Sequence, residues 1–476
     1  MAAHSEPADH PTPWTETRGR RIVRWVLATV GAQSVVSLLN LATGVISARV
    51  MGPDLKGMFN AVILWPGVFS NLTGMGLSAA FTSSYARAPR EERRRLFIVA
   101  SALAIGWGIV GAGLCAIVAP RLLGHLGAEL RPWVLVASWV PVCTVWTYVC
   151  GSLLGVEERF DWLNWIRVSR PAAVVLGLLA LALADRLTPY SQLVLVWSTA
   201  FLSSVPTLVL AVRAAARLPW GAVGVAVHRT AYRLSTLGFR YYAITLASTF
   251  NGQLDSMLAT IWLSARQIGL YAVASSALTV VGMLSGAFAT VFFPMSAADG
   301  PEVVVRRTMA ALRRGLLLFL LVEVCLVALA RPALYLMYGA RYLGAWPAVL
   351  ALAPEAVCIA CLGVLYSGCY VLREFAIPSW GEVVGALTGL LFLVLFIPRW
   401  GIAGAGAAGS LSYALDLVTV LALWIRRHGL SWGALVPGRD DVAAVVRIAA
   451  EQARGLARRL GHVARRAWFP GLEGGG

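Results

Sequence analysis

Apolar residues along this chain gather in long continuous runs instead of alternating with polar ones. Many runs reach the roughly 20 residues that an α-helix needs to cross a bilayer, whereas membrane β-barrels show short alternating segments. The pattern therefore predicts an all-α polytopic membrane protein with about twelve transmembrane helices. The expected ranges are 26–48, 58–84, 96–119, 132–154, 168–184, 192–212, 241–263, 269–294, 315–331, 347–371, 379–397 and 402–425.

A basic segment, 213–240, divides these helices into two groups of six. Because six is even, the second group enters the membrane in the same direction as the first, so any repeat between them is parallel. We expect an N-terminal lobe at 26–212 and a C-terminal lobe at 241–425 that are pseudo-symmetric. A polar segment, 1–25, precedes them, and a basic tail, 426–476, follows.

The tail 426–476 carries an apolar stripe with steps of three and four, while its arginines lie off that stripe. Charge at this density is costly in a membrane core, so the pattern predicts a surface helix on anionic lipid or on partner enzymes. A plain solvated helix is the alternative. The stripe consists of Val442, Val445, Ala449, Ala453, Leu456, Leu460, Val463 and Ala467.

A short motif recurs after the first helix of each half. Ser-Ala-Arg stands at 47–49 and is followed by Gly57; it returns at 264–266 and is followed by Gly269. The same placement in both halves indicates an internal repeat whose motif marks one end of the first helix.

Both first helices also carry a polar stripe. In the first half the stripe steps by three and four, which places its members on one helical face. Such a stripe is typical either of a packing seam between helices or of a hydrated cavity between the lobes. The cavity interpretation predicts lining by Gln33, Ser37 and Asn40 in the first half and by Ser248 and Asn251 in the second.

Composition and charge agree with a membrane location. Hydrophobic residues make up 58% of the 476, charged residues 13%, and the net charge is +17. Of the 40 basic residues, 31 lie in the segments that alternate with the outer loops, including both termini, and 9 lie in the outer loops. Positive charge marks the cytoplasmic side. We therefore place both termini in the cytoplasm and interpret the charge as topology and lipid contact, not nucleic-acid binding.

Motifs for catalysis or cofactors are weak. The seven cysteines lie in apolar spans, and the "CIAC" at 358–361 lacks the βαβ context of a redox motif. The "GAGAAG" at 404–409 lies inside a predicted transmembrane helix, where small residues permit close packing, so it is not a dinucleotide site. We expect no catalytic residues, no metal and no cofactor beyond a coupling ion.

Acidic residues inside spans are scarce and usually functional. Asp255 and Glu355 are expected at roughly the same depth, counting about 1.5 Å per residue. Glu382 is expected about 16 Å from that level and Asp416 about 8 Å. We predict that Asp255, helped by Asn251 and Glu355, binds Na⁺ or H⁺; a structural hydrogen bond to a neighbouring helix is the alternative.

Five stretches carry a family resemblance by their order and spacing. They are "ARVMGPDLKGMFN" after the first helix, "DSMLATIWLSARQIGLYAVA", "FFPMSAAD", "LMYGARYLGAW" and "FIPRWGIAGAGAAGSLSYAL". Together they resemble the polysaccharide flippases of the Wzx type in the multidrug/oligosaccharidyl-lipid/polysaccharide (MOP) exporter superfamily, over about residues 24–425.

This resemblance implies two six-helix lobes, as in MATE exporters and MurJ, that alternate between inward and outward openings. It implies a flippase in the bacterial cytoplasmic membrane that moves an isoprenoid-pyrophosphate-linked oligosaccharide or polysaccharide precursor. The implied partners are the lipid bilayer, the lipid-linked glycan, and a polysaccharide polymerase or glycosyltransferases. A cation-coupled multidrug antiporter of the same superfamily is the first alternative, and a membrane glycan polymerase or ligase is the second.

The chain departs from the lipid II flippases, which carry arginines within the first helix where this chain has Ser37 and Thr43. The residues that contact a pyrophosphate must therefore be sought elsewhere. Arg87, Arg240 and Arg373 stand at cytoplasmic helix ends and are the candidates; anchoring of the helices at the membrane surface is the alternative.

Overall fold

The computed structural model describes residues 16–219, 227–276, 300–439, 441–443 and 447. Its first half is built from seven α-helices and two short 3-10 turns. They are α1 (Glu16–Thr73), α2 (Leu77–Arg87), α3 (Arg90–Leu122), η1 (Gly124–Leu126), η2 (Ala128–Leu130), α4 (Arg131–Ala137), α5 (Val140–Val156), α6 (Phe160–Leu183) and α7 (Pro189–Ala216).

The second half begins with a long helix that leads into the expected seventh span. Its elements are α8 (Val227–Trp262), a helical segment at 265–276, α10 (Pro301–Tyr338), η3 (Ala340–Ala345), α11 (Trp346–Val371), α12 (Ala376–His428) and η4 (Trp432–Leu435). The rest of the expected eighth span and most of the amphipathic tail lie outside the described residues.

The predicted fold class is confirmed: the described residues form helices and no strands. Eight helices in this part are long and apolar enough to cross a membrane. Two of them are bent and each covers two expected spans. The bend lies at Gly52 in α1, where φ is 72°, and at Gly401 in α12, where φ is 56°. Glycine adopts positive φ without a Cβ clash, so the chain turns there without a loop.

Some helix boundaries differ from those expected. The second span ends at Thr73 and resumes at Leu77, because Gly74 and Gly76 permit a tight turn in which Gly76 has a φ of 60°. The fifth and ninth spans are longer than the apolar runs that predicted them, since α6 and α10 continue into polar sequence at their first turns. Hydropathy marks the membrane core, whereas a helix continues past it wherever its backbone hydrogen bonds still form.

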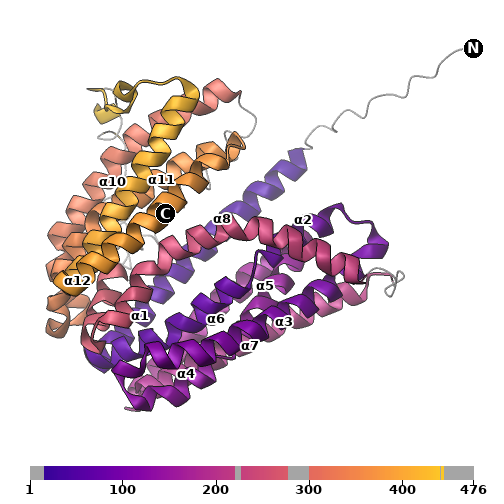
Figure 1. The fold of residues 1–476 in the computed structure, drawn as a ribbon, viewed down its shortest axis with the longest axis horizontal. Coiled ribbons are helices and arrows are strands. Elements are labelled where there is room, and N and C mark those ends of the chain that lie inside the picture. Colours follow the sequence, from indigo (N-terminus) through magenta and orange to yellow (C-terminus); the bar gives the residue numbers. More distant parts are fainter. Residues whose placement is uncertain (1–15, 220–226, 277–299, 440, 444–446, 448–476) are drawn as a thin grey trace, which may run out of the picture.

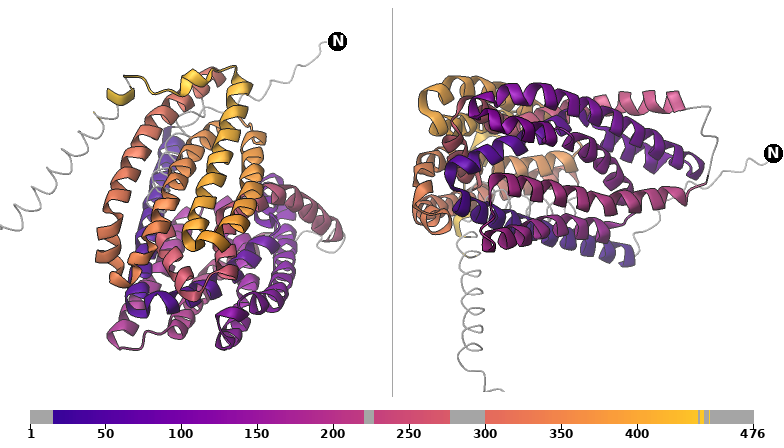
Figure 2. Two further views of the ribbon diagram at one scale, coloured as in Figure 1. Left: turned by 60° about the vertical axis from the view of Figure 1, so that its left-hand side comes forward. Right: turned by 90° about the horizontal axis from the view of Figure 1, so that it is seen from below.

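The helices form two bundles, of which one contains α2–α7 and the other α10–α12 (Figure 1). The bundles approach each other at one end and diverge toward the other, as a second view also shows (Figure 2). Helix α8 joins them, because it packs against α2 and α3 of the first bundle and against α12 of the second. The lobe boundaries near 212 and 241 stay predictions.

The two bundles meet through the repeated motif, at what we call the closed end. A Cβ placed on Gly57 would lie 1.7 Å from the Ala265 carbonyl oxygen and 3.0 Å from the Gly269 nitrogen. A Cβ on Gly269 would lie 1.9 Å from the Pro53 oxygen and 3.1 Å from the Gly57 nitrogen. The near-equal reciprocal distances indicate that the two repeats face each other about a local two-fold axis.

Other groups strengthen the closed end. The Tyr342 hydroxyl donates a 3.2 Å hydrogen bond to the Ala48 carbonyl oxygen, and the Arg49 Nε donates one of 2.7 Å to the Met337 carbonyl oxygen. One buried apolar cluster contains residues of both halves, among them Met51 and Tyr271. Burial of apolar side chains here stabilises the contact.

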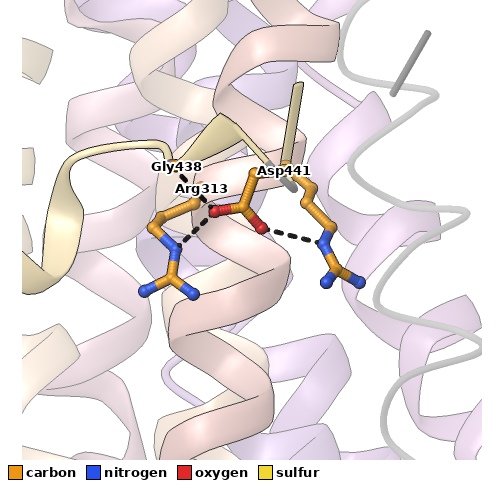
Figure 3. A network of polar contacts seen from close by, with 4 residues as sticks. Arg313, Gly438 and Asp441 are labelled. Atoms are coloured by element: carbon orange, nitrogen blue, oxygen red, sulfur yellow. Dashed lines mark hydrogen bonds and ion pairs between the residues drawn. The ribbon is translucent and has the colours of Figure 1, made fainter. Parts of the chain in front are cut away.

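At the other end of the second bundle, a carboxylate attaches the segment after η4 to α10 (Figure 3). Asp441 accepts hydrogen bonds of 3.0 Å from Arg313 and 3.0 Å from Arg314, and one of 3.2 Å from the Gly438 amide. Burial alone would raise the pKa of Asp441, but the Gly438 amide and the two guanidinium groups together lower it.

Candidate functional site

The two acidic residues predicted as an ion site lie on different helices, α8 and α11. Asp255 lies on α8, where its Oδ2 accepts a 2.6 Å hydrogen bond from the Tyr271 hydroxyl in segment 265–276. Glu355 lies on α11 and is 7% exposed. Among these groups, the hydrogen bond is the one between Asp255 and Tyr271, and an ion shared by Asp255 and Glu355 stays a prediction.

The surroundings of Glu355 leave its carboxylate short of partners. Its backbone N–H donates a 3.1 Å hydrogen bond to the Ser410 hydroxyl, which donates one of 2.5 Å to the Ala351 carbonyl oxygen. Its Oε2 is buried and has no hydrogen-bond partner among the described residues. A Cβ on Gly409 would lie 2.2 Å from that oxygen. The glycine of "GAGAAG" therefore provides space for Glu355.

A second acidic pair lies about one helical turn away along α8. The Asn251 amide nitrogen donates a 3.1 Å hydrogen bond to Glu382 Oε2 and one of 3.4 Å to Asp416 Oδ2. The Tyr366 hydroxyl donates to Asp416 Oδ1 over 3.4 Å. Asp416 is fully buried. Asn251 thus bridges two carboxylates from opposite arms of the bent α12.

Three glycines at four-residue spacing on the first arm of α12 make this packing possible. A Cβ on Gly381 would lie 2.3 Å from Asp416 Oδ1, and one on Gly385 would lie 2.8 Å from the Asn251 amide nitrogen. A Cβ on Gly389 would lie 2.9 Å from the Ser412 hydroxyl. Without side chains, this face lets α8 and the second arm of α12 bring their polar groups close.

The second pair was not found by counting residues along each helix. Glu382 was expected about 16 Å from the level of Asp255 and too far to share an ion with it, and in the structure it accepts a hydrogen bond from Asn251. Asn251 connects the levels, because it lies one turn before Asp255, or about 6 Å along α8. The sequence did contain a signal for this second pair: Asn251 on one helix, and glycines at every fourth position, 381, 385 and 389, on another.

The residues of the expected polar stripe on α1 differ in their exposure. Gln33 and Asn40 are exposed and Ser37 is half-buried. Near the closed end, the buried Ser47 hydroxyl donates a 2.8 Å hydrogen bond to Gln192 of α7. The backbone of Ser248 lies in α8, while its side chain lies outside the described residues. The cavity-lining role of these residues stays a prediction.

The three candidate pyrophosphate contacts do not form one site. Arg87 lines a cavity between α2, α3 and the start of α8. Arg373 lines a different cavity beside Arg426 and Arg427 in the second bundle. Arg240 is exposed on α8 and lines neither. A role in pyrophosphate binding stays a prediction for all three.

The acidic cluster has the chemistry of a site for a hard monovalent cation or a proton. We define the acidic cluster as Asp255, Glu355, Glu382 and Asp416 with Asn251 between them. Its carboxylate, amide and hydroxyl oxygens are the ligands that such cations prefer. The described residues contain no group of three or more His, Cys, Asp or Glu that could hold a metal ion together. An ion bound by Asp255 and Glu355, or by Glu382 and Asp416, would therefore have two carboxylates and otherwise neutral ligands.

Comparison with known proteins was carried out by family and by structure. A model of the family described as polysaccharide biosynthesis protein matches residues 22–298. No curated protein sequence matches the chain.

Three solved structures are similar in fold. The lipid II flippase MurJ in an inward closed conformation has a TM-score of 0.72 at 15% identity, over 89% of this chain and 93% of that one. An inward-facing multidrug resistance MATE transporter of the MOP superfamily has a TM-score of 0.65 at 12% identity, over 84% and 98%. An outward-facing structure with the same description has 0.56 at 12%, over 85% and 94%.

Proposed function

Because the chain belongs to the polysaccharide biosynthesis protein family and has the fold of MOP transporters, we propose that it flips a lipid-linked glycan across the cytoplasmic membrane. The substrate we propose is an isoprenoid-pyrophosphate-linked oligosaccharide or polysaccharide precursor. The protein moves this substrate by alternating access and without chemical change.

One observation supports the mechanism most directly: the two repeats meet head to head at the closed end while the bundles diverge elsewhere (Figure 1). A contact made by backbone atoms of two glycines is compact and is lost as a unit when the bundles rock apart. Alternation then consists of opening this contact and closing the opposite end, as rigid-body rocking of repeats does.

The cargo explains why such a fold is needed. Sugar hydroxyls and a pyrophosphate lose their hydration in hydrocarbon, at several kcal/mol for each polar group left without a partner. A path between two bundles keeps the head group in a polar environment while the lipid tail stays in the bilayer. The exposed Gln33 and Asn40 on α1 suit such a path.

We place the closed end on the outer side and both termini in the cytoplasm of a bacterial cell. The support is the charge distribution, with 31 of the 40 basic residues on the side of the termini. The proposed partners are the bilayer, the lipid-linked glycan, and the polymerase or glycosyltransferases that make or extend it.

Coupling to Na⁺ or H⁺ completes the proposal, with the acidic cluster as its site. Two carboxylates packed together in a low-dielectric interior repel each other unless a proton or a cation lies between them. Asn251 and the glycine faces around Asp416 hold the second pair together. Filling or emptying the cluster changes the packing of α8 against α12, and α8 is the helix that joins the bundles.

A cation-coupled multidrug antiporter is the second candidate. The buried acidic cluster favours it, since acidic residues also suit an organic cation. The two functions differ in their cargo and not in their fold.

The decisive experiment uses purified protein in lipid vesicles with a labelled isoprenoid-pyrophosphate oligosaccharide. The substrate should become accessible on the far leaflet faster than in empty vesicles, and Asp255→Asn or Asp416→Asn should remove the dependence on an imposed Na⁺ or pH gradient. Glu129→Gln is the matched control, because Glu129 is exposed on η2. Equal rates with and without protein exclude the flippase, and gradient-driven efflux of cationic dyes instead establishes the antiporter.

A further inference from the structure

A cavity of about 250 Å³ lies where α8 begins, between the end of α2 and the start of α3. Its lining is polar and mostly basic. We call it the basic pocket, and its lining residues are Ser84, Arg87, Ala88, Pro89, Glu92, Arg95, Leu96, Arg229, Thr230 and Arg233.

The charge of the basic pocket is strongly unbalanced. It has four arginines and one glutamate, which gives a net charge of +3. Glu92 is 3.4 Å from Arg95 in an i,i+3 pair on α3, so it neutralises one guanidinium at most. The remaining arginines come from two elements, α2 and α8. Positive charges from separate helices converging on a cavity attract an anion.

Two buried donors in the pocket have no partner among the described residues. They are the hydroxyl of Ser84, a residue that is 6% exposed, and the Nε of Arg95. A buried donor without a partner is costly, so native structures nearly always provide one. Both atoms belong to residues that line the same cavity, but protein atoms cover the two donors themselves. A ligand with several acceptor oxygens would satisfy both once these side chains turn toward the cavity.

The cavity size agrees with such a ligand. A water molecule occupies about 30 Å³ of liquid, so the pocket has room for roughly eight waters, or for a phosphate group and a few of them. Guanidinium groups bind phosphate oxygens in a forked geometry, and a hydroxyl donates to the remaining oxygen. Carboxylates offer fewer acceptor oxygens than the pocket has donors.

The place of the pocket gives the ligand a structural consequence. Arg229, Thr230 and Arg233 lie in the first two turns of α8, whereas the other lining residues belong to the first bundle. The same helix continues to Asn251 and the second bundle. An anion between these groups would hold the start of α8 on the first bundle.

We propose that the basic pocket binds a phosphate group and thereby fixes the first turns of α8 on α2 and α3. The phosphate belongs either to a membrane lipid headgroup or to a free inorganic phosphate or pyrophosphate. Binding at this site does not depend on the transported cargo, so the proposal stands or falls independently of the flippase function.

The first test measures binding in the wild-type chain. The full-length protein is placed in nanodiscs of neutral phosphatidylcholine, and its thermal unfolding is followed by tryptophan fluorescence while pyrophosphate is titrated at constant ionic strength. Occupancy should raise the unfolding midpoint by a few degrees and saturate. A midpoint that changes no more than with chloride overturns the proposal, provided that nanodiscs containing phosphatidic acid also give no rise.

The nanodisc composition separates the two sources. If phosphatidic acid raises the midpoint and added pyrophosphate then has no further effect, the lipid headgroup occupies the pocket. If pyrophosphate raises it equally in both membranes, the free anion does. Hydrogen exchange adds a structural measurement: amides at 227–236 should exchange more slowly with ligand, and unchanged exchange there refutes the fixing of α8.

Variants locate the site. Arg229→Gln with Arg233→Gln should weaken apparent binding at least tenfold, since each substitution removes a positive charge and its charged hydrogen bonds to the phosphate. Ser84→Ala should weaken it less. Arg213→Gln is the matched control, because Arg213 is exposed at the last turn of α7 and outside the pocket. Wild-type affinity in the double variant overturns the assignment; misfolding of that variant leaves the wild-type titration and exchange data to decide.

Discussion

Adding one methyl group at the closed end should shift the balance between the two conformations of the transporter. Gly57→Ala places a Cβ 1.7 Å from the Ala265 carbonyl oxygen, whereas an ordinary contact begins near 3.4 Å. The obstacle is backbone on both sides, since the Gly269 nitrogen would lie 3.0 Å away. No rotation of a side chain can relieve this overlap, so the two helices must separate by about the missing 1.7 Å.

The size of the effect follows from overpacking. Forcing one extra methyl into a tight contact costs about 1–3 kcal/mol, occasionally more. That cost applies only to the conformation in which the closed end is closed. A penalty of this size changes a two-state equilibrium by about 5- to 150-fold. We therefore expect Gly57→Ala, and equally Gly269→Ala, to favour the conformation with this end open.

Hydrogen exchange on the reconstituted protein is a suitable assay, because it needs no new cysteines in a chain that already has seven. Amides at 48–58 and 265–270 should exchange faster in Gly57→Ala by a factor within that range. Gly67→Ala is the control on the same helix, since a Cβ there would meet nothing within 4 Å. Alanine at that place should be neutral or add up to about 1 kcal/mol of helix stability.

The reasoning is refuted if Gly57→Ala and Gly67→Ala give the same exchange at the closed end. It is also refuted if Gly57→Ala lowers stability throughout the protein without selective opening of these two segments. Transport should slow in Gly57→Ala, because a conformation that must be revisited in each cycle has become rarer.

Three further predictions concern other parts of the fold. Asp441→Asn should lower stability at pH 7 by about 1 kcal/mol, discounted for the exposure of its arginine partners. Although burial opposes it, hydrogen bonds lower the native pKa of Asp441. Its stabilising contribution is therefore complete above the unfolded pKa of about 3.9 and is lost as pH falls through the native pKa. The difference in stability between wild type and variant should shrink as pH falls below about 3.9, and a difference that does not change with pH contradicts the assignment. Lys56→Met should raise the unfolding midpoint, because the partners of the buried Nζ, the Ser47 hydroxyl and the Phe59 ring, are neutral and do not balance its charge. A lower midpoint would show that these two contacts outweigh the cost of burying the charge. Gly381→Ala should abolish any Na⁺-dependent rise in the unfolding midpoint, since its Cβ would lie 2.3 Å from an Asp416 oxygen, and an unchanged rise would remove Asp416 from the ion site.

The class of the protein and the approximate positions of most described membrane helices were predictable from the apolar runs. In lipid every backbone polar group needs an internal partner, so a long apolar run has to be a helix, and its period and length are visible in one dimension. The repeat was also visible, because Ser-Ala-Arg and the following glycine recur at matching places. The glycines at 52 and 401 turn the chain within α1 and α12, close to where the sequence separates one span from the next.

The contacts between those helices could not be predicted from the sequence and are known from the packed structure. Counting residues gave the depth of each acid along its own helix but not which helices lie side by side, nor how far a side chain reaches across. Asn251 therefore joins Glu382 to Asp416 although these acids were assigned to different levels. The basic pocket likewise needs the start of α8 to lie beside α2 and α3. Its arginines on α8 follow those on α2 and α3 by more than 130 residues in the sequence. Periodicity encodes the face of a helix, whereas the partner of that face depends on how all the helices pack together.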